Sequence, residues 1–161
     1  MITLEEALEV VQNRDGAAEN TLSDNTLIMT VGLPRSGKST WAKQQSSPVV
    51  SPDAIRLALH GNPFIGLAED FIWAIAKVMV RALFISGHGT VILDATNTKH
   101  SRRERFRSHT WIRKFQVFDT DKEECIRRAK DGGKDFLVPV IERMAEEQEP
   151  IKEFEYDVAD S

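Results

Sequence analysis

The chain has 161 residues, 41% of them hydrophobic and 29% charged, and a formal net charge of −4. This size and composition are typical of one soluble globular domain with a proper core. The single cysteine, Cys125, excludes an internal disulfide, and the acidic start "MITLEEALEVV" does not have the pattern of a signal peptide. The most apolar segment, residues 71–85, is too short to span a bilayer, so we expect a cytoplasmic protein with no membrane partner.

The predicted elements alternate between helices and strands along the chain. A helix at 3–12 and a polar connector to residue 25 precede a domain at 26–151, which is followed by an acidic tail at 152–161. Strands are predicted at 26–31, 48–51, 90–93 and 115–119, with a short fifth strand near Phe154. Helices are predicted at 38–46, 52–60, 67–86, 121–130 and 138–147, and from Ser101 through a basic stretch, with Ser101 and Glu104 as a capping box. This order predicts an α/β fold, a parallel sheet of four or five strands with helices on both faces.

The segment "VGLPRSGKST", residues 31–40, contains the full G-x-x-x-x-G-K-[ST] pattern of a phosphate-binding P-loop. The strand before it and the helix after it are the context that this motif requires, and they disfavour the alternative of an ordinary Gly-rich turn. In such a loop the backbone N–H groups point at the phosphates, Lys38 reaches the β- and γ-phosphates, and the Ser39 hydroxyl binds Mg²⁺. The predicted nucleotide-binding residues are Gly32, Pro34, Arg35, Ser36, Gly37, Lys38, Ser39 and Thr40.

Two carboxylates follow predicted strands, at the sheet edge where parallel α/β folds bind ligands. Asp94 ends an apolar strand in the manner of a Mg²⁺-binding acid, although an Asx turn is an alternative. Asp53 opens a helix, where it is either a helix cap or a base that accepts a hydroxyl proton. Arg56 lies on the same helix face as Asp53, and the pair suits a substrate that carries a hydroxyl near a phosphate.

Charge is unevenly distributed along the chain. Residues 99–114 contain seven Lys/Arg and one acid, a local charge of +6 that leaves −10 for the rest. The last twenty residues, 142–161, carry eight acids and two bases. Such segregation allows a local phosphate-binding surface on an acidic protein, and the alternative is a solvated basic helix that balances the acidic end.

Four segments together, "GLPRSGKSTWAKQ", "SPDAIRLAL", "VILDATNTKHSRRERF" and "VPVIERM", resemble the polynucleotide 5′-kinase family of phages and nucleic-acid repair systems. The resemblance runs over about residues 26–151, and the kinase domain of the phage enzymes is the most similar part. It implies a P-loop NTPase-type fold and transfer of the γ-phosphate of ATP (or GTP) to a 5′-hydroxyl of DNA or RNA, with Mg²⁺. It also implies that a separate phosphatase or ligase would complete any end repair.

The resemblance implies roles for individual residues. Asp53 matches the general base, and Arg56 the arginine that binds the phosphate on the 3′ side of the accepting nucleotide. Lys38 matches the P-loop lysine, and Ser39 with Asp94 the Mg²⁺ ligands. Further substrate contacts are implied for Asn97, Arg102 and Arg103. A lid cation over the donor phosphates would come from the segment containing Arg127, Arg128, Lys130 and Lys134, with Arg128 taken as catalytic and Arg127 and Lys130 as nucleotide contacts.

Two other functions remain open from the residues alone. A small-molecule kinase acting on a nucleoside, nucleotide or antibiotic would share the P-loop, the aspartate after the second strand and the lid. A non-catalytic NTP-binding module would share only the loop. The Asp53–Arg56 pair disfavours the binding module, and the basic stretch favours a polymeric acceptor.

Overall fold

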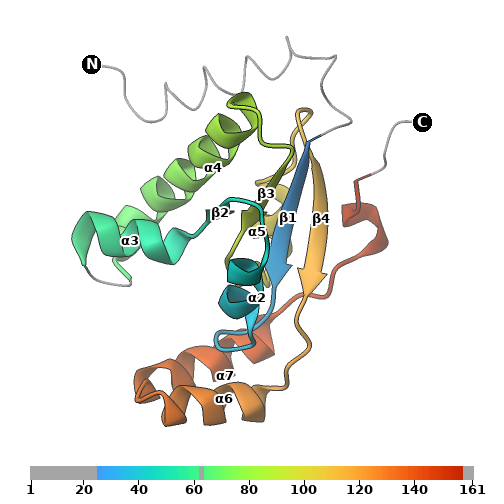
Figure 1. Cartoon of the computed structure of the whole chain (residues 1–161). Helices are drawn as coiled ribbons and strands as arrows, with labels where there is room; N and C mark the ends of the chain where they lie inside the picture. Colours follow the sequence, from blue (N-terminus) through green and yellow to red (C-terminus); the bar gives the residue numbers. More distant parts are fainter. Residues whose placement is uncertain (1–24, 62–63, 158–161) are drawn as a thin grey trace.

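The computed structural model describes residues 25–61 and 64–157, so the helix predicted at 3–12 and its connector lie outside the described residues. Four parallel strands form one sheet in the order β2-β3-β1-β4 (Figure 1). They are β1 (Thr26–Val31), β2 (Val49–Val50), β3 (Thr90–Leu93) and β4 (Ile112–Val117). The predicted α/β class with a parallel sheet is confirmed.

Helices connect the strands at or near the predicted positions. The helices are α2 (Lys38–Gln44), α3 (Pro52–His60), α4 (Glu69–Ile85), α5 (His100–Glu104), α6 (Lys122–Asp131) and α7 (Val138–Glu147). Single 3₁₀ turns are η1 (Gly66–Ala68), η2 (Asp135–Leu137) and η3 (Glu153–Glu155). The boundaries of β1, β3, α3 and α7 are as predicted, because each of these segments has a clear apolar pattern between turn or capping residues.

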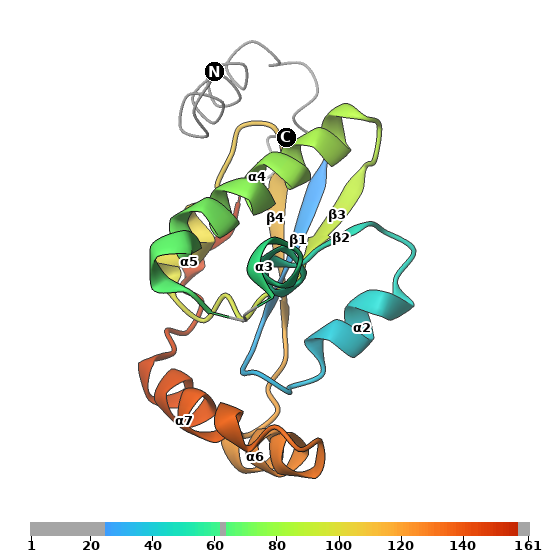
Figure 2. The same ribbon diagram turned by 90° about the vertical axis from the view of Figure 1, so that its left-hand side faces the viewer.

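The main core lies between one face of the sheet and α4, which runs along the strands in Figure 2. The parallel register pairs Leu27 with Val91 and Met29 with Leu93, which places these four side chains on the same face. Side chains of α4 at helical spacing pack against them, namely Ile72, Ala76, Val80 and Phe84. β1, an interior strand of this sheet, ends at Val31, directly before the P-loop.

A second, smaller core joins α6 and α7 into a helical hairpin. This pair lies beyond the carboxyl ends of β1 and β4, on the side of the P-loop (Figure 1). Cys125 and Ala129 of α6 and Ile141 of α7 pack around Leu33, which belongs to the P-loop. We call α6, η2 and α7 the lid hairpin, and its core couples its position to that of the loop.

The basic stretch is not the single helix that the sequence predicts. Only α5 is helical, and its N-cap is Lys99 with no side-chain cap, so the predicted capping box of Ser101 and Glu104 is wrong. The chain then turns and enters β4 at Ile112, three residues before the predicted strand start. Pairing of β4 with β1 explains the difference, because it places Trp111 at the core and outweighs local helix propensity.

The strand predicted near Phe154 is also wrong, because this segment forms the 3₁₀ turn η3. The turn inserts the Glu155 carboxylate, 0% exposed, among arginines of the basic stretch. Arg103 donates to both of its oxygens, from Nε at 2.7 Å and from Nη2 at 3.1 Å. Arg113 donates to the Glu155 carbonyl oxygen and to Asp157. The acidic end and the basic stretch thus neutralise each other within the protein.

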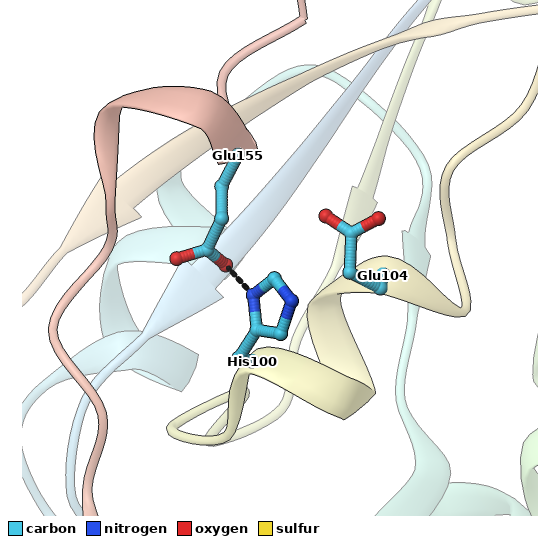
Figure 3. A group of neighbouring side chains, drawn as sticks. All are labelled: His100, Glu104 and Glu155. Atoms are coloured by element: carbon cyan, nitrogen blue, oxygen red, sulfur yellow. Dashed lines mark ion pairs between the residues drawn. The ribbon is translucent and has the colours of Figure 1, made fainter.

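His100, Glu104 and Glu155 lie together in this network (Figure 3), with ligand atoms within 4.8 Å of one another. Nδ1 of His100 is 2.9 Å from Oε1 of Glu155. Such a group has the chemistry of a metal site, but both oxygens of Glu104 accept hydrogen bonds from Arg107, and those of Glu155 accept from Arg103. The arginines already supply the positive charge, so we assign the group to an ion-pair network.

Candidate active site

The P-loop has the backbone that phosphate binding requires. A Cβ atom at Gly32 would lie 2.8 Å from Ser36 Oγ and 3.0 Å from the Phe118 carbonyl oxygen, so only glycine fits there. Arg35 and Gly37 have left-handed backbone angles, with φ of 67° and 104°. When left-handed and right-handed residues alternate, the chain curves so that successive backbone N–H groups face one concavity, where an anion binds.

Lys38, the first residue of α2, is buried within the P-loop. Its Nζ donates to the Leu33 carbonyl oxygen and, at 3.2 Å, to Ser36 Oγ. Burial lowers the pKa of Lys38 to about 8, and the negative charges of Asp94 and Asp53 oppose this shift. The free protein therefore holds a cation that is easily deprotonated until a phosphate lies beside it.

The two predicted Mg²⁺ ligands lie together. Ser39 Oγ of α2 donates to Oδ2 of Asp94, just past β3, at 2.8 Å. A hydroxyl and a carboxylate are the hard oxygen ligands that Mg²⁺ prefers, so the donor set fits this ion. The position of Asp94 is set by Thr30, whose Oγ1 donates to Ala95 O at 2.8 Å and accepts from Ala95 N at 3.1 Å.

Asn97 is buried behind the carboxyl edge of the sheet, near Asp94. It is 1% exposed, and its Nδ2 donates to the Thr30 carbonyl oxygen at 2.8 Å. Its backbone has a positive φ of 47°, which turns the chain away from β3. Asn97 is therefore buried against β1 with its Oδ1 unpartnered, and the substrate contact predicted for it stays a prediction.

Asp53 is exposed at the start of α3. Ser51 is the N-cap of α3, and its side chain accepts from Ala54 N, so the alternative that Asp53 caps the helix is wrong. The Asp53 side chain is 86% exposed, and its Oδ1 accepts from Nη1 of Arg56 at 2.5 Å. Its charge also raises the pKa of Lys38, so the carboxylate lies near enough to the P-loop lysine to influence it.

Glu69 is the residue that the sequence analysis missed. It begins α4 and accepts two hydrogen bonds from Arg56, Nε to Oε2 at 2.9 Å and Nη2 to Oε1 at 2.6 Å. These bonds, with that from Trp73, lower the pKa of Glu69. An acid in the first turn of a helix is common without any such role, so the sequence contains no signal that singles it out.

The lid hairpin brings one of its predicted cations to the P-loop. Arg128 Nη1 donates to the Arg35 carbonyl oxygen, and Arg35 Nη2 donates to the Arg128 carbonyl oxygen, both at 3.2 Å. The Arg127 guanidinium is bonded to both Glu124 and Asp131 on the exposed side of α6, whereas Arg128 shares only the Glu124 contact, through Nε at 3.0 Å. Lys130 and Lys134 are exposed, and no contact with the P-loop is seen for either.

The two arginines predicted to contact substrate from the basic stretch have opposite environments. Arg103 is 0% exposed and bonded to Glu155, to Asn97 O and to Glu149 O, so the prediction for Arg103 is at odds with its burial. Arg102 remains partly accessible and lies flat on Trp73, with Cζ 3.8 Å from the ring centroid.

Comparisons with known proteins agree with this geometry. Residues 27–149 match a family described as AAA domain (AAA_33). A chain from the structure of the Pnkp1/Rnl/Hen1 complex is 30% identical, with a TM-score of 0.60, over 68% of this chain and 40% of that one. A chain from the structure of the Pnkp1/Rnl/Hen1 RNA repair complex shares the fold at 22% identity and a TM-score of 0.58, over 81% of this chain and 48% of that one. The protein thus spans less than half the length of either chain.

No curated protein matches the sequence. Within the described residues, no helix combines the length and the apolar character needed to cross a membrane. The family and structure matches confirm the predicted resemblance to P-loop domains of the polynucleotide kinase type. Because the family profile covers residues 27–149, well over half of the chain, the protein belongs to the AAA domain family of P-loop proteins.

Proposed function

We propose that the protein is an ATP-dependent polynucleotide kinase, which transfers the γ-phosphate of ATP to the 5′-hydroxyl of DNA or RNA. The observation that carries this proposal is the pair on α3. An exposed carboxylate, Asp53, lies beside Arg56, whose guanidinium Glu69 holds in place. A base next to a phosphate-binding cation suits a 5′-hydroxyl with a phosphate on the 3′ side of the same nucleotide.

The proposed reaction is an in-line displacement that depends on positioning and charge neutralisation. Asp53 accepts the proton of the 5′-hydroxyl while the oxygen of that hydroxyl forms a bond to the γ-phosphorus. The bond from that phosphorus to the β–γ bridging oxygen breaks, and ADP carries away the electron pair. Lys38 and Arg128 stabilise the charge on the transferred group. Mg²⁺ bound by Ser39 and Asp94 would neutralise charge on the β- and γ-phosphates when present.

A small-molecule kinase is the second candidate, and one observation favours it. Arg103, Arg107 and Arg113 are paired with Glu104, Glu155 and Asp157, so the basic stretch offers less free positive charge than the sequence suggests. An assay with γ-labelled ATP and a panel of acceptors separates the two candidates. We expect label on 5′-hydroxyl oligonucleotides. Label on nucleosides or other small acceptors only would assign the second candidate, and phosphate release alone would indicate an NTPase.

The solved neighbours belong to an RNA repair complex of several proteins. This supports a partner that prepares or joins the same ends, a separate phosphatase or ligase. It also supports nucleic-acid 5′ ends as the substrate of the domain described here.

The lowered pKa of Lys38 predicts that ATP affinity depends on pH. Above about pH 8 the free protein has lost this proton, and phosphates bind the charged form, so binding takes up a proton. We expect the Kd of ATP to rise by up to about tenfold per pH unit above pH 8, as titration calorimetry would measure. Lys38→Arg stays charged throughout and should show a much flatter profile. A wild-type Kd that is constant up to about pH 9.5 would contradict the assignment.

The lid geometry predicts unequal effects for adjacent arginines. Arg128→Ala should lower the rate of phosphoryl transfer on the order of 10³-fold, because a guanidinium at the transferred phosphate is lost. Arg127→Ala removes the same charge one residue away and should leave the rate within about twofold, because exposed ion pairs contribute little. Single-turnover rates at saturating ATP measure both. Equal losses of rate for the two variants would contradict a specific role of Arg128, because they would show that only the total positive charge of the lid hairpin matters.

A further inference from the structure

Arg102 differs from three of the arginines near it. Arg103, Arg107 and Arg113 are each paired with a carboxylate of the acidic end. Within the part of the chain that the structure describes, Arg102 forms no ion pair with a carboxylate, and its Nη1 is buried without a hydrogen-bond partner. Buried guanidinium donors normally have an acceptor, so Nη1 is a donor that a water molecule or a bound anion can still satisfy.

The guanidinium is nevertheless held in place. It lies flat over the Trp73 ring, with Cζ 3.8 Å from the centroid. Trp73 itself is fixed by an edge contact with Phe106 and by a hydrogen bond to Glu69. A stacked arginine keeps its in-plane donors free for a planar or tetrahedral anion, and its position costs little entropy on binding.

Arg102 also lies near Arg56, on the side of the site where the acceptor would bind. Glu69 holds Arg56 with two hydrogen bonds and accepts one from Trp73, whose ring carries Arg102, so Glu69 and Trp73 together link the two guanidinium groups. Burial, together with the like charges of Arg105 and Arg56, lowers the pKa of Arg102 to about 10. Glu69 and Asp70 oppose this only in part, so the surroundings of Arg102 favour an added anion.

We propose that Arg102, positioned by Trp73, binds the second backbone phosphate of the acceptor strand, one nucleotide beyond the phosphate that Arg56 binds. The inference rests on the proposed function, because it takes the acceptor to be a nucleic-acid strand. The strand would run from Asp53 past Arg56 and Glu69 to Arg102. It makes acceptor length, rather than the reacting nucleotide alone, a determinant of affinity. A phosphate contact of this kind contributes in a salt-dependent way and without regard to base sequence.

The test compares two acceptors that share the same 5′ nucleoside. A nucleoside 3′-monophosphate has one phosphate, and the corresponding dinucleotide with a 3′-phosphate has two. With γ-labelled ATP, Arg102→Ala should lower kcat/KM for the dinucleotide on the order of tenfold through KM, and leave the mononucleotide within about twofold. The dependence of dinucleotide KM on salt should also become weaker. Lys114→Ala, which removes an exposed cation of the same basic stretch, is the matched control and should change neither acceptor.

The outcomes separate this inference from the function on which it rests. A wild type that labels neither acceptor overturns both the function and the subsite. A wild type that labels both, with equal losses for the two acceptors in Arg102→Ala, overturns the subsite alone, because it shows that Arg102 acts through Arg56. No loss for the dinucleotide overturns it as well. Partial recovery of the dinucleotide KM in Arg102→Lys supports it, because the charge returns without the planar donors.

Discussion

Asp53→Asn is expected to lower the rate of phosphoryl transfer by about 10²–10⁴-fold, because an amide cannot accept the proton of the acceptor hydroxyl. The substitution preserves the shape of the side chain. The side chain is exposed, and Glu69 continues to hold Arg56 through two hydrogen bonds. The fold and the acceptor-binding arginine should therefore be unaffected. ATP affinity should also stay within about twofold, because the Asp53 charge is a minor influence on Lys38.

The chain provides a matched control for this variant. Asp70 is another exposed carboxylate, in the first turn of α4 beside Glu69. Asp70→Asn removes the same charge near the acceptor side and should keep most of the activity. Single-turnover transfer and ATP binding, measured for both variants, distinguish a base from a general charge effect. Unchanged transfer in Asp53→Asn would remove Asp53 as the base.

Glu155→Gln is expected to have the largest effect on stability, a loss of about 3–5 kcal/mol in the free energy of unfolding. The carboxylate is completely buried, and its two oxygens accept bonds from Arg103 and from the Lys152 backbone. Removing its charge leaves the Arg103 guanidinium buried and uncompensated. Urea denaturation of the wild type and the variant measures the difference. Glu153→Gln alters an exposed acid of the same turn and should stay within about 0.5 kcal/mol.

The same carboxylate predicts a stability profile at acid pH. Burial opposes its ionisation, but the bonds from Arg103, Lys152 N and His100 outweigh this and lower the pKa of Glu155 to about 2. A carboxyl group whose pKa falls on folding stabilises the protein above its unfolded pKa, and this contribution is lost as the pH falls. The stability of the wild type should thus decline from about pH 4.5 toward about pH 2, and Glu155→Gln should show a shallower decline. Identical slopes would contradict the role of Glu155 as a buried, charged anchor.

The parts of the site that depend on local sequence were predictable. The P-loop could be predicted from residues 31–40 alone, because its function depends on local features. These are the glycines, the lysine and hydroxyl side chains, and the helix that begins directly after the loop. The proximity of Ser39 and Asp94 also follows from sequence, since parallel strands end at one edge. Asp53 was correctly predicted to open α3, and the structure shows that Ser51, two residues earlier, is the cap.

The parts that depend on tertiary contacts were not predictable. The basic stretch has helical propensity, but pairing with β1 makes its end the edge strand β4, and Glu155 from the acidic end buries Arg103. Nothing in the local pattern indicates that these distant charges meet. Glu69 is similar, because its role exists only once α3 and α4 are packed together. The contact of Arg128, and not Arg127, with the P-loop agrees with the residue taken as catalytic, but only the packing of α6 shows which side faces the loop.

The measurement that tests the central proposal most directly uses two oligonucleotides of identical sequence, one with a 5′-hydroxyl and one with a 5′-deoxy end. Each is incubated with the full chain, γ-labelled ATP and Mg²⁺, and the label on the strand is followed over time. The proposed function predicts label on the 5′-hydroxyl strand, none on the 5′-deoxy strand, and loss of labelling in Asp53→Asn. Equal labelling of both strands, or no labelling of either while ATP is consumed, would contradict it.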